Sequence, residues 1–303
     1  MRITNNMLSN SLIRNLESAQ GKMDQLQNQL SSGQRISKPS DDPVGIQNAM
    51  RLKSNISGVE QWKNNANAAI DYMNTTDSTL GDMTSMLQRV RELAVQGANG
   101  TLGTDDRNAV ANEVDQISDQ LHLMANTQVG SKYIFSGTAT DKALQIQDPV
   151  TKIWSSQTSA GNDQEVKFEV GNNVNIPISV NGNNLFGDTA TIPSGIFTTL
   201  SALSKALKAN DSTSINNAIG SVDANINNVI ALRSDLGARV NRMTSIQSQL
   251  DSTSINLQQN LSSIQDADMA KTITDFTNQQ NVYKAALSVG AKIIQPSLVD
   301  FMR

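Results

Sequence analysis

The chain contains no cysteine among its 303 residues and only one histidine, His122. The absence of cysteine excludes disulfides, thiolate metal sites and thiol nucleophiles. A single imidazole cannot complete a zinc motif such as H-E-x-x-H, which needs two histidines. The sequence also lacks a P-loop, a G-x-G-x-x-G and a G-x-S-x-G motif. We therefore expect no catalytic site, no metal site and no bound cofactor.

Aromatic residues are scarce, at 4% of the chain, and hydrophobic residues make up 38%. Large rounded cores depend on aromatic area, so this composition favours slim helical bundles. No window approaches about 18 continuous apolar residues, and the N-terminus lacks the apolar segment of a secretory signal. The net charge of −4 gives no general attraction to phosphate. These features alone predict a cytoplasmic, mostly helical protein that binds neither nucleic acid nor membranes.

Apolar residues recur with heptad spacing at both ends of the chain, in steps of four and three residues. The N-terminal seam consists of Leu12, Leu16, Ala19, Met23, Leu26 and Leu30. The C-terminal seam consists of Met269, Ile273, Phe276, Gln280, Tyr283, Leu287, Gly290 and Ile294. Both stripes are narrow, and the other faces are rich in Asn, Gln and Ser. Each terminal helix therefore needs a partner helix to cover its seam.

We expect residues 1–40 and 265–303 to be coiled-coil assembly segments that are disordered in the monomer and fold on assembly. The alternative is that the two seams form a self-contained bundle core. On the assembly interpretation, the axial contacts between subunits are made by Leu12, Leu16, Met23, Leu26, Leu30, Ile273, Phe276, Tyr283, Leu287 and Ile294.

The central part of the chain predicts a helical rod domain made of residues 41–136 and 196–264. Its first seam predicts a helix over about residues 44–97. Asp42 can cap this helix, and Pro43 fits its first turn, where a missing N–H costs nothing.

Two further long helices complete the predicted rod. One begins at Thr104 and ends at Gly130. The other follows a seam up to Ile264, in which polar residues occupy apolar positions: Arg233, Gln247 and Ser254. These interruptions weaken the seam, so the helix is expected to be a bundle partner rather than an independent zipper.

Residues 137–195 are predicted to form a small β-rich insertion. Val166, Phe168 and Val170 alternate with charged neighbours, and a second alternating run follows a turn at 171–173. This arrangement predicts a β-hairpin. Antiparallel helices would bring the chain ends together. The fold class is therefore mainly α with a β-rich insertion: an elongated antiparallel helical bundle or coiled coil formed by both chain ends, with the β domain at the far tip.

Several polar residues that could support chemistry have simpler structural interpretations. His122 is expected to be a partly exposed structural residue on a helix. Asp266 and Asp268 could hold a hard cation, but acids at a helix break more often act as caps. Ser263 has the spacing of a capping box with Asp266. A mild basic cluster is expected to be solvated or subunit-facing: Arg35, Lys38, Arg51 and Lys53.

Four stretches of this sequence resemble the flagellin superfamily. The stretches LSSGQRI (30–36) and PSDDPVG (39–45) are similar to its N-terminal signature. LQRVRELAVQ (87–96) resembles the helix that follows this signature, and IQDADMA (264–270) resembles the start of its terminal helix. The resemblance includes both ends of the chain and the long helical regions.

Within this family the chain resembles the hook–filament junction proteins, or third hook-associated proteins, more than the flagellins. The main reason is GSKYIFSGT (130–138), which is similar to the junction proteins where their central domain begins. Pro39 and Pro43 stand where flagellins are usually Ala-rich, and the final SLVDFMR departs from the usual flagellin terminus. One alternative is a flagellin, the bulk filament subunit. Others are a non-flagellar coiled-coil adaptor and an enzyme on a flagellin scaffold, whose metalloprotease form the lone histidine disfavours.

The resemblance implies secretion through the flagellar type III apparatus, with an export chaperone holding the C-terminal region. It implies a ring of copies of this chain between the first hook-associated protein and flagellin, which adapts a flexible hook to a rigid filament. The terminal helices would form an inner tube, the rod the next shell, and the insertion would project outward. Arg89, Leu93 and Glu113 match flagellin positions used by an innate immune receptor; ordinary axial packing is the alternative reading of these three.

Overall fold

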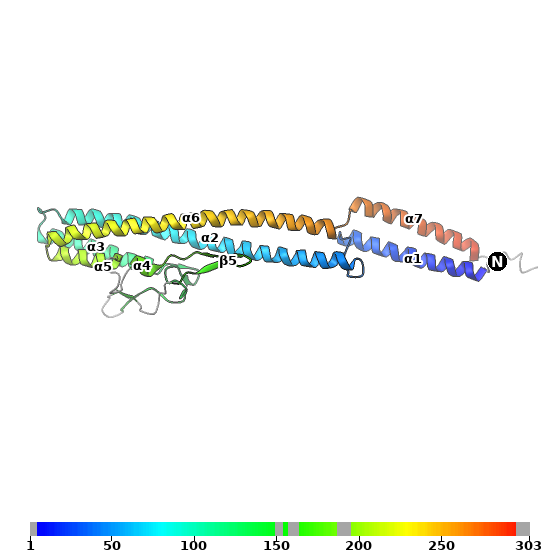
Figure 1. Cartoon of the computed structure of the whole chain (residues 1–303), viewed down its shortest axis with the longest axis horizontal. Helices are drawn as coiled ribbons and strands as arrows, with labels where there is room; N and C mark the ends of the chain where they lie inside the picture. Colours follow the sequence, from blue (N-terminus) through cyan, green and yellow to red (C-terminus); the bar gives the residue numbers. More distant parts are fainter. Residues whose placement is uncertain (1–4, 149–153, 157–163, 187–194, 295–303) are drawn as a thin grey trace, which may run out of the picture. The chain divides into compact units, whose positions relative to one another are not determined.

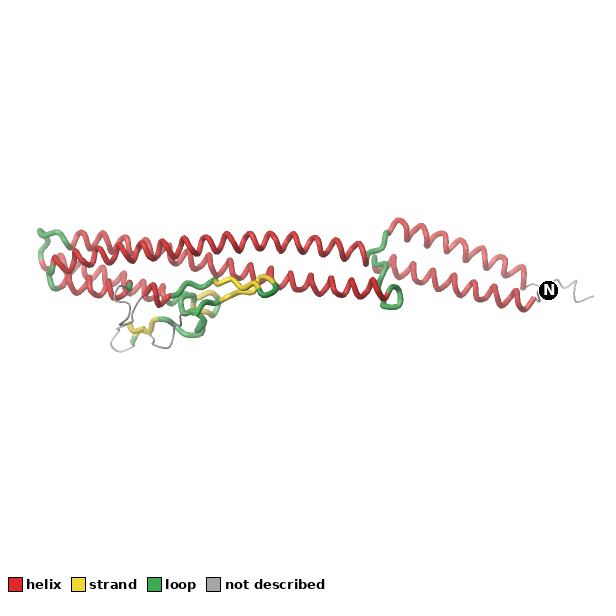
Figure 2. Tube along the Cα trace, in the orientation of Figure 1, coloured by secondary structure: helices red, strands yellow, loops and turns green. Residues whose placement is uncertain are grey.

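The computed structural model describes residues 5–148, 154–156, 164–186 and 195–294, and these are mainly helical (Figure 1). The described strands lie between residues 128 and 177, and Figure 2 shows them in yellow beside the long helices. The chain divides into two compact units. Unit 1 contains residues 1–58 and 253–303, and unit 2 contains residues 59–252. Two long helices, α2 (Pro43–Gly97) and α6 (Ser212–Gln265), contribute to both units.

Unit 1 contains the two terminal helices, α1 (Asn5–Ser32) and α7 (Met269–Ile294), which lie antiparallel against each other (Figure 1). We call these two helices the terminal pair. The prediction that both chain ends are helical and come together is confirmed. α1 ends as predicted at Gly33, whose φ of +69° is one that side-chain-bearing residues rarely adopt. The Gly33 N–H donates to the Gln29 carbonyl at 2.8 Å.

The predicted cap of α2 is confirmed, whereas the predicted cap near residue 266 is corrected. Asp42 Oδ1 accepts hydrogen bonds from the N–H groups of Val44 at 3.1 Å and Gly45 at 2.9 Å. The second helix break does lie near residue 266, but α7 is capped by Asp268, whose Oδ1 accepts from the Lys271 N–H at 3.1 Å. Ser263 forms no capping box, because its hydroxyl donates back to the Asn260 carbonyl within α6.

Unit 2 is a helical bundle in which α2 and α6 run antiparallel, and α3 (Thr104–Ala125) packs on α5 (Ile196–Lys208) (Figure 1). Its core is made of buried Leu, Met, Val, Ile and Ala side chains from all four helices. α3 ends before the predicted stop at Gly130. Gly130 instead has a φ of +64° between two short strands, in the left-handed region that favours glycine.

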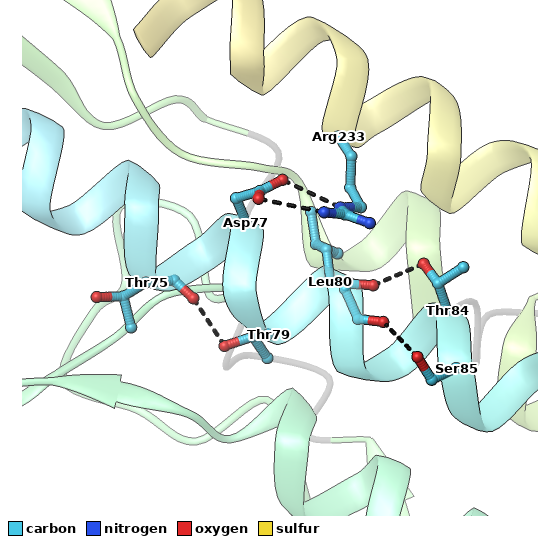
Figure 3. Close-up of polar contacts among 8 residues, drawn as sticks. Thr75, Asp77, Thr79, Leu80, Thr84, Ser85 and Arg233 are labelled. Carbon is cyan, nitrogen blue, oxygen red and sulfur yellow. Dashed lines mark hydrogen bonds and ion pairs between the residues drawn. The ribbon is translucent and has the colours of Figure 1, made fainter.

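Polar pairs join α2 to α6 within unit 2. They are Lys63–Asp251, Asn67–Gln247, Asp77–Arg233 and Arg91–Asp223. Moving along α2 from one pair to the next moves a similar distance back along α6, so the pairs share one antiparallel register. Figure 3 shows Arg233 donating to both carboxylate oxygens of Asp77, at 3.0 and 3.2 Å. Two of the polar residues that interrupt the predicted seam therefore have partners on the facing helix.

The described residues contain three antiparallel two-stranded sheets, of which the first precedes the predicted insertion at residues 137–195 and the other two lie within it. They are formed by β1 (Gln128–Val129) with β2 (Lys132–Tyr133), β3 (Gln145–Gln147) with β4 (Trp154–Ser156), and β5 (Lys167–Gly171) with β6 (Val174–Pro177). The last sheet is the predicted hairpin. A short helix, α4 (Gly182–Phe186), follows it.

The insertion packs along the side of the unit 2 helices, which corrects the predicted position at the far tip. Asn65 on α2 donates to the Glu169 carbonyl of the insertion at 2.8 Å. Just before the insertion, the Ile134 carbonyl accepts from the Tyr72 hydroxyl of α2 at 2.9 Å. The helices of unit 2 end instead at the loops 98–103 and 209–211 (Figure 1). The physical reason is that the insertion has an apolar face of its own, which is buried in the helical core: Val170, Ile176, Ile178 and Val180.

Candidate assembly surface

The predicted N-terminal seam forms the contact between α1 and α7. Apart from Ala19, which is buried, its apolar residues are half-buried: Leu12, Leu16, Met23, Leu26 and Leu30. On α7, Phe276 and Tyr283 are half-buried and Gly290 is buried. The helices approach closely at Gly290, where an added Cβ would lie 2.7 Å from Leu12 Cδ2. These seam residues therefore meet within a single chain, and each keeps part of its surface in water.

Four residues of the predicted C-terminal seam are exposed: Met269, Ile273, Gln280 and Leu287. The side chain of Ile273 is 53% exposed and that of Leu287 is 46% exposed. Together with Met269, which is also exposed, they form what we call the Ile273 stripe. Ile294 is the last residue of α7, and its side chain lies outside the described residues.

A second exposed apolar stripe on α7 was not predicted from the sequence. Val282 and Val289 are 56% and 52% exposed, and we call them the Val282 stripe. At about 100° of turn per residue, Ile273 lies about 80° to one side of Tyr283 and Val282 about 100° to the other. The only signal for this stripe in the sequence is a pair of valines seven residues apart.

The two stripes give α7 exposed apolar side chains on both flanks of the face that contacts α1. Fully burying one Val, Leu or Ile side chain contributes roughly 1.5–3 kcal/mol. Neighbouring helices that covered both stripes would therefore stabilise the terminal pair considerably. The described part of α1 exposes fewer large apolar residues, namely Met7 and Ile13.

His122 is buried, at 8% exposed, so the prediction of a partly exposed histidine is wrong. Its ring stacks on Phe197 of α5, with ring centroids 3.6 Å apart, and on Trp154 of β4 at 4.9 Å. Trp154 also donates from Nε1 to Asp119 on α3 at 2.9 Å. Helical periodicity could not predict this arrangement, because both covering rings come from segments distant in the sequence.

Of the three residues that match the flagellin positions used by an innate immune receptor, the structure joins Arg89 to Glu113 and buries Leu93. Arg89 on α2 donates from Nε and Nη2 to Glu113 on α3, at 2.9 and 2.7 Å, and this carboxylate raises the pKa of the guanidinium. Leu93 is in the core of unit 2 and is 1% exposed. Ordinary packing accounts for Leu93, and receptor binding by these three residues stays a prediction.

The remaining polar candidates have structural positions. Asp268 caps α7, and no three His, Cys, Asp or Glu residues gather as a metal-binding group in the part of the chain that the structure describes. The residues of the basic cluster are all exposed: Arg35, Lys38, Arg51 and Lys53. None of the helices in the described ranges is long and apolar enough to span a bilayer.

Comparison with known proteins matches both ends of the chain to one family. Residues 3–140 match the bacterial flagellin N-terminal helical region, and residues 219–302 match the bacterial flagellin C-terminal helical region. Flagellin from Listeria innocua is 30% identical over 290 residues, which cover 95% of this chain and 94% of that protein. Flagellar hook-associated protein 3 from Escherichia coli is 25% identical over 307 residues, which cover 94% and 95%.

The fold is also similar to that of a solved structure. The crystal structure of flagellar hook-associated protein 3 from Legionella pneumophila matches with a TM-score of 0.62 and 16% sequence identity. The match covers 71% of this chain and 98% of that chain. The terminal pair and both of its linkers to the long helices lie inside the two matched family regions.

Proposed function

Because the chain belongs to the flagellin family, we propose that it joins the flagellar hook to the filament as a short ring and adapts the flexible hook to the rigid filament. At the coarser level it is an axial structural component of the bacterial flagellum, not an enzyme. In the proposed ring, each copy contacts other copies around the axis. The first hook-associated protein lies on one side of the ring and flagellin lies on the other.

The observation that best supports a ring is the presence of exposed apolar stripes on both flanks of α7. A subunit in a closed ring has one neighbour on each side, which it contacts through two different surfaces. The Ile273 stripe and the Val282 stripe are two such surfaces. The half-buried α1 seam supports the same proposal, because neighbouring helices would complete its burial.

The preference for the junction over the filament rests on residues 130–138. Part of this segment is fixed against the helices, since Ile134 and Phe135 are buried in the core of unit 2. The alternative, a flagellin, has its own support in the relative from Listeria innocua. Both alternatives predict the same assembly surface and differ in the location of the protein on the flagellum.

We also propose a separate role for each segment of the chain, with the segment bounds that the sequence predicts. Residues 1–40 and 265–303 act as assembly segments that fold when subunits meet. Residues 41–136 and 196–264 form the rod, and residues 137–195 project from it. Export through the flagellar type III apparatus suits a chain without cysteine, which enters no disulfide that would block unfolding. A chaperone bound to the C-terminal region would cover the stripes of α7 before assembly.

Immunogold labelling of isolated flagella with antibodies against this chain tests the proposed location. Label confined to a band where hook and filament meet is the expected result. Label along the whole filament would make the chain a flagellin, and absence of label from every flagellum would contradict a flagellar role.

Leu287→Asp tests the assembly surface itself. Leu287 is exposed on the Ile273 stripe, so the aspartate should abolish attachment to flagella without changing the urea unfolding of the free chain. Leu26→Asp should also abolish attachment, but it disturbs the contact between α1 and α7 as well. Asn281→Asp is the matched control, because Asn281 is exposed and lies about 200° around α7 from Tyr283. Normal attachment of the Leu287 variant would count against the proposed surface.

A further inference from the structure

The two linkers between the terminal pair and the long helices are joined through their backbones. Gln34 and Asp266 form an antiparallel bridge. The Ala267 N–H donates to the Gly33 carbonyl at 2.9 Å, and the Arg35 N–H donates to the Gln265 carbonyl at 2.7 Å. We call residues 33–36 together with residues 264–267 the linker clasp. The clasp lies within unit 1 and joins one segment from each of the two family regions.

Arg35 gives the linker clasp its strongest side-chain contact. Its Nη2 donates to the Ile264 carbonyl at 2.7 Å. This carbonyl belongs to the last turn of α6, where carbonyl groups lack partners within the helix and the helix dipole favours a positive charge. The neighbouring Ile36 is 1% exposed, so a buried side chain also holds the same linker in place. A residue from the N-terminal part of the chain therefore completes the end of a C-terminal helix.

The register of the linker clasp continues into the terminal pair. Along α1, Ala19 precedes the clasp by about the same number of residues as Gln279 follows it along α7. Gln279 Nε2 donates to the Ala19 carbonyl at 3.3 Å. Farther along, Leu12 meets Gly290, again at nearly equal separations from the clasp. The pairing therefore runs from the clasp along both helices without a slip.

The terminal pair itself contains little that would specify this register. Heptad seams present the same apolar pattern again after a shift of seven residues. Within the described parts of α1 and α7 there is no ion pair between the two helices, whereas α2 and α6 in unit 2 are joined by several. The register of the terminal pair must therefore be fixed mainly from outside its seam.

We propose that the linker clasp sets the register of the terminal pair and that Arg35 is its main positioning residue. Each chain then presents the Ile273 and Val282 stripes at one fixed axial position relative to α1. Without the clasp, α1 and α7 can pair one heptad out of register. The proposal concerns contacts within one chain and does not depend on the ring, so its test is separate from tests of attachment.

Disulfide trapping tests this proposal cleanly, because the natural chain contains no cysteine. One variant of the full chain combines Leu12→Cys with Gly290→Cys and reports the observed register. A second combines Leu12→Cys with Tyr283→Cys and reports a slip of one heptad. Both are made with Arg35 present and with Arg35→Gln, and intrachain disulfides are quantified after mild oxidation. The ratio of the two yields is the readout, so transient pairing in the free chain is sufficient.

With Arg35 present, we expect the observed-register pair to cross-link preferentially. Arg35→Gln should lower the ratio of observed to slipped register by about tenfold, the effect of losing a hydrogen bond from a charged group. Arg51→Gln is the matched control, because Arg51 is also exposed in unit 1 but bonds only to Asn48 on its own helix, at 3.3 Å. An unchanged ratio in Arg35→Gln would overturn the proposal. So would the absence of the observed-register cross-link when Arg35 is present.

Discussion

The terminal pair and the helical bundle of unit 2 are built from the same sequence pattern but are buried to different degrees. Both contain antiparallel helices with heptad seams. In unit 2 the seam of α2 is almost completely buried, as Met73, Leu80 and Met83 show. In the terminal pair the corresponding leucines are only half-buried. The two regions differ in how many segments pack on each helix. In unit 2, α3, α5 and the insertion share one core with α2 and α6, whereas α1 and α7 contact mainly each other. A heptad seam thus becomes part of a core where the same chain supplies enough helices to bury it. Where the chain does not, the seam stays partly exposed and can serve as an interface.

Truncating a seam leucine in each region should give the largest difference between the two regions in the free energy of unfolding that is lost. Leu80→Ala removes a fully buried side chain and should lower the free energy of unfolding by about 3 kcal/mol. Leu26→Ala should lower it by less than about 1 kcal/mol, because Leu26 is already partly hydrated in the free chain. Urea unfolding followed by far-UV circular dichroism measures both values. Equal losses would show that the terminal pair is as well packed as unit 2.

A tyrosine gives unit 2 a pH dependence that the terminal pair should lack. Burial raises the pKa of Tyr72 to about 12, from an ordinary value of 10.0. Since ionisation is easier in the unfolded chain, the stability that neutral Tyr72 contributes is complete below pH 10 and is lost as pH rises toward 12. The loss should be about 1.4 kcal/mol per pH unit at most. Above pH 10, the free energy of unfolding should fall less steeply with pH in Tyr72→Phe than in Tyr283→Phe. Identical dependence on pH in the two variants would contradict the assignment.

The Asp77–Arg233 pair should contribute a smaller amount to unit 2. The carboxylate of Asp77 raises the pKa of Arg233, but both side chains are more than a third exposed, so solvent screens the interaction. Asp77→Arg should destabilise the fold by about 1 kcal/mol, and adding Arg233→Asp should restore part of the loss. A double-mutant cycle by urea unfolding gives the coupling energy. A coupling energy of zero would remove this pair as a determinant of register.

The smallest expected effect is a local change in backbone protection with pH, in the linker that leads into α2. The backbone N–H of Lys38, followed by that of Ser37, lowers the pKa of Asp41 below its ordinary value of 3.8. The stability that this carboxylate contributes is therefore present above pH 3.8 and is lost as pH falls through the lowered pKa. Hydrogen exchange at the Ser37 and Lys38 amides, corrected for intrinsic rates, should accelerate over that range. Asp41→Asn should abolish this pH dependence, and its persistence would refute the assignment.

Much of the fold followed from the sequence because periodicity and turn residues act locally. The heptads predicted the helices and the meeting of the chain ends, Gly33 and Asp42 marked two helix boundaries, and alternation predicted the β5–β6 hairpin. The family was indicated by short motifs near the linkers rather than by composition.

Other features depended on tertiary contacts that no local pattern contains. The C-terminal seam has two neighbouring rows, and only packing decides that Phe276 and Tyr283 face α1 while Ile273 and Leu287 remain exposed. In the sequence Arg233 only interrupts an apolar seam, because its partner Asp77 lies on a different helix (Figure 3). The burial of His122 and the lateral position of the insertion likewise arise from segments far apart in the sequence.

Hydrogen exchange of the free chain and of assembled flagella would test the central claim most directly. We predict that in the free chain the amides of α1 and α7 exchange almost as fast as those of an unfolded peptide. Residues 59–97 of α2 and 212–252 of α6 should exchange slowly in the same sample, because they belong to the self-contained unit. Assembly should slow exchange in α1 and α7 alone. Equal protection of the terminal pair and unit 2 in the free chain would contradict the claim that neighbouring subunits complete the terminal pair.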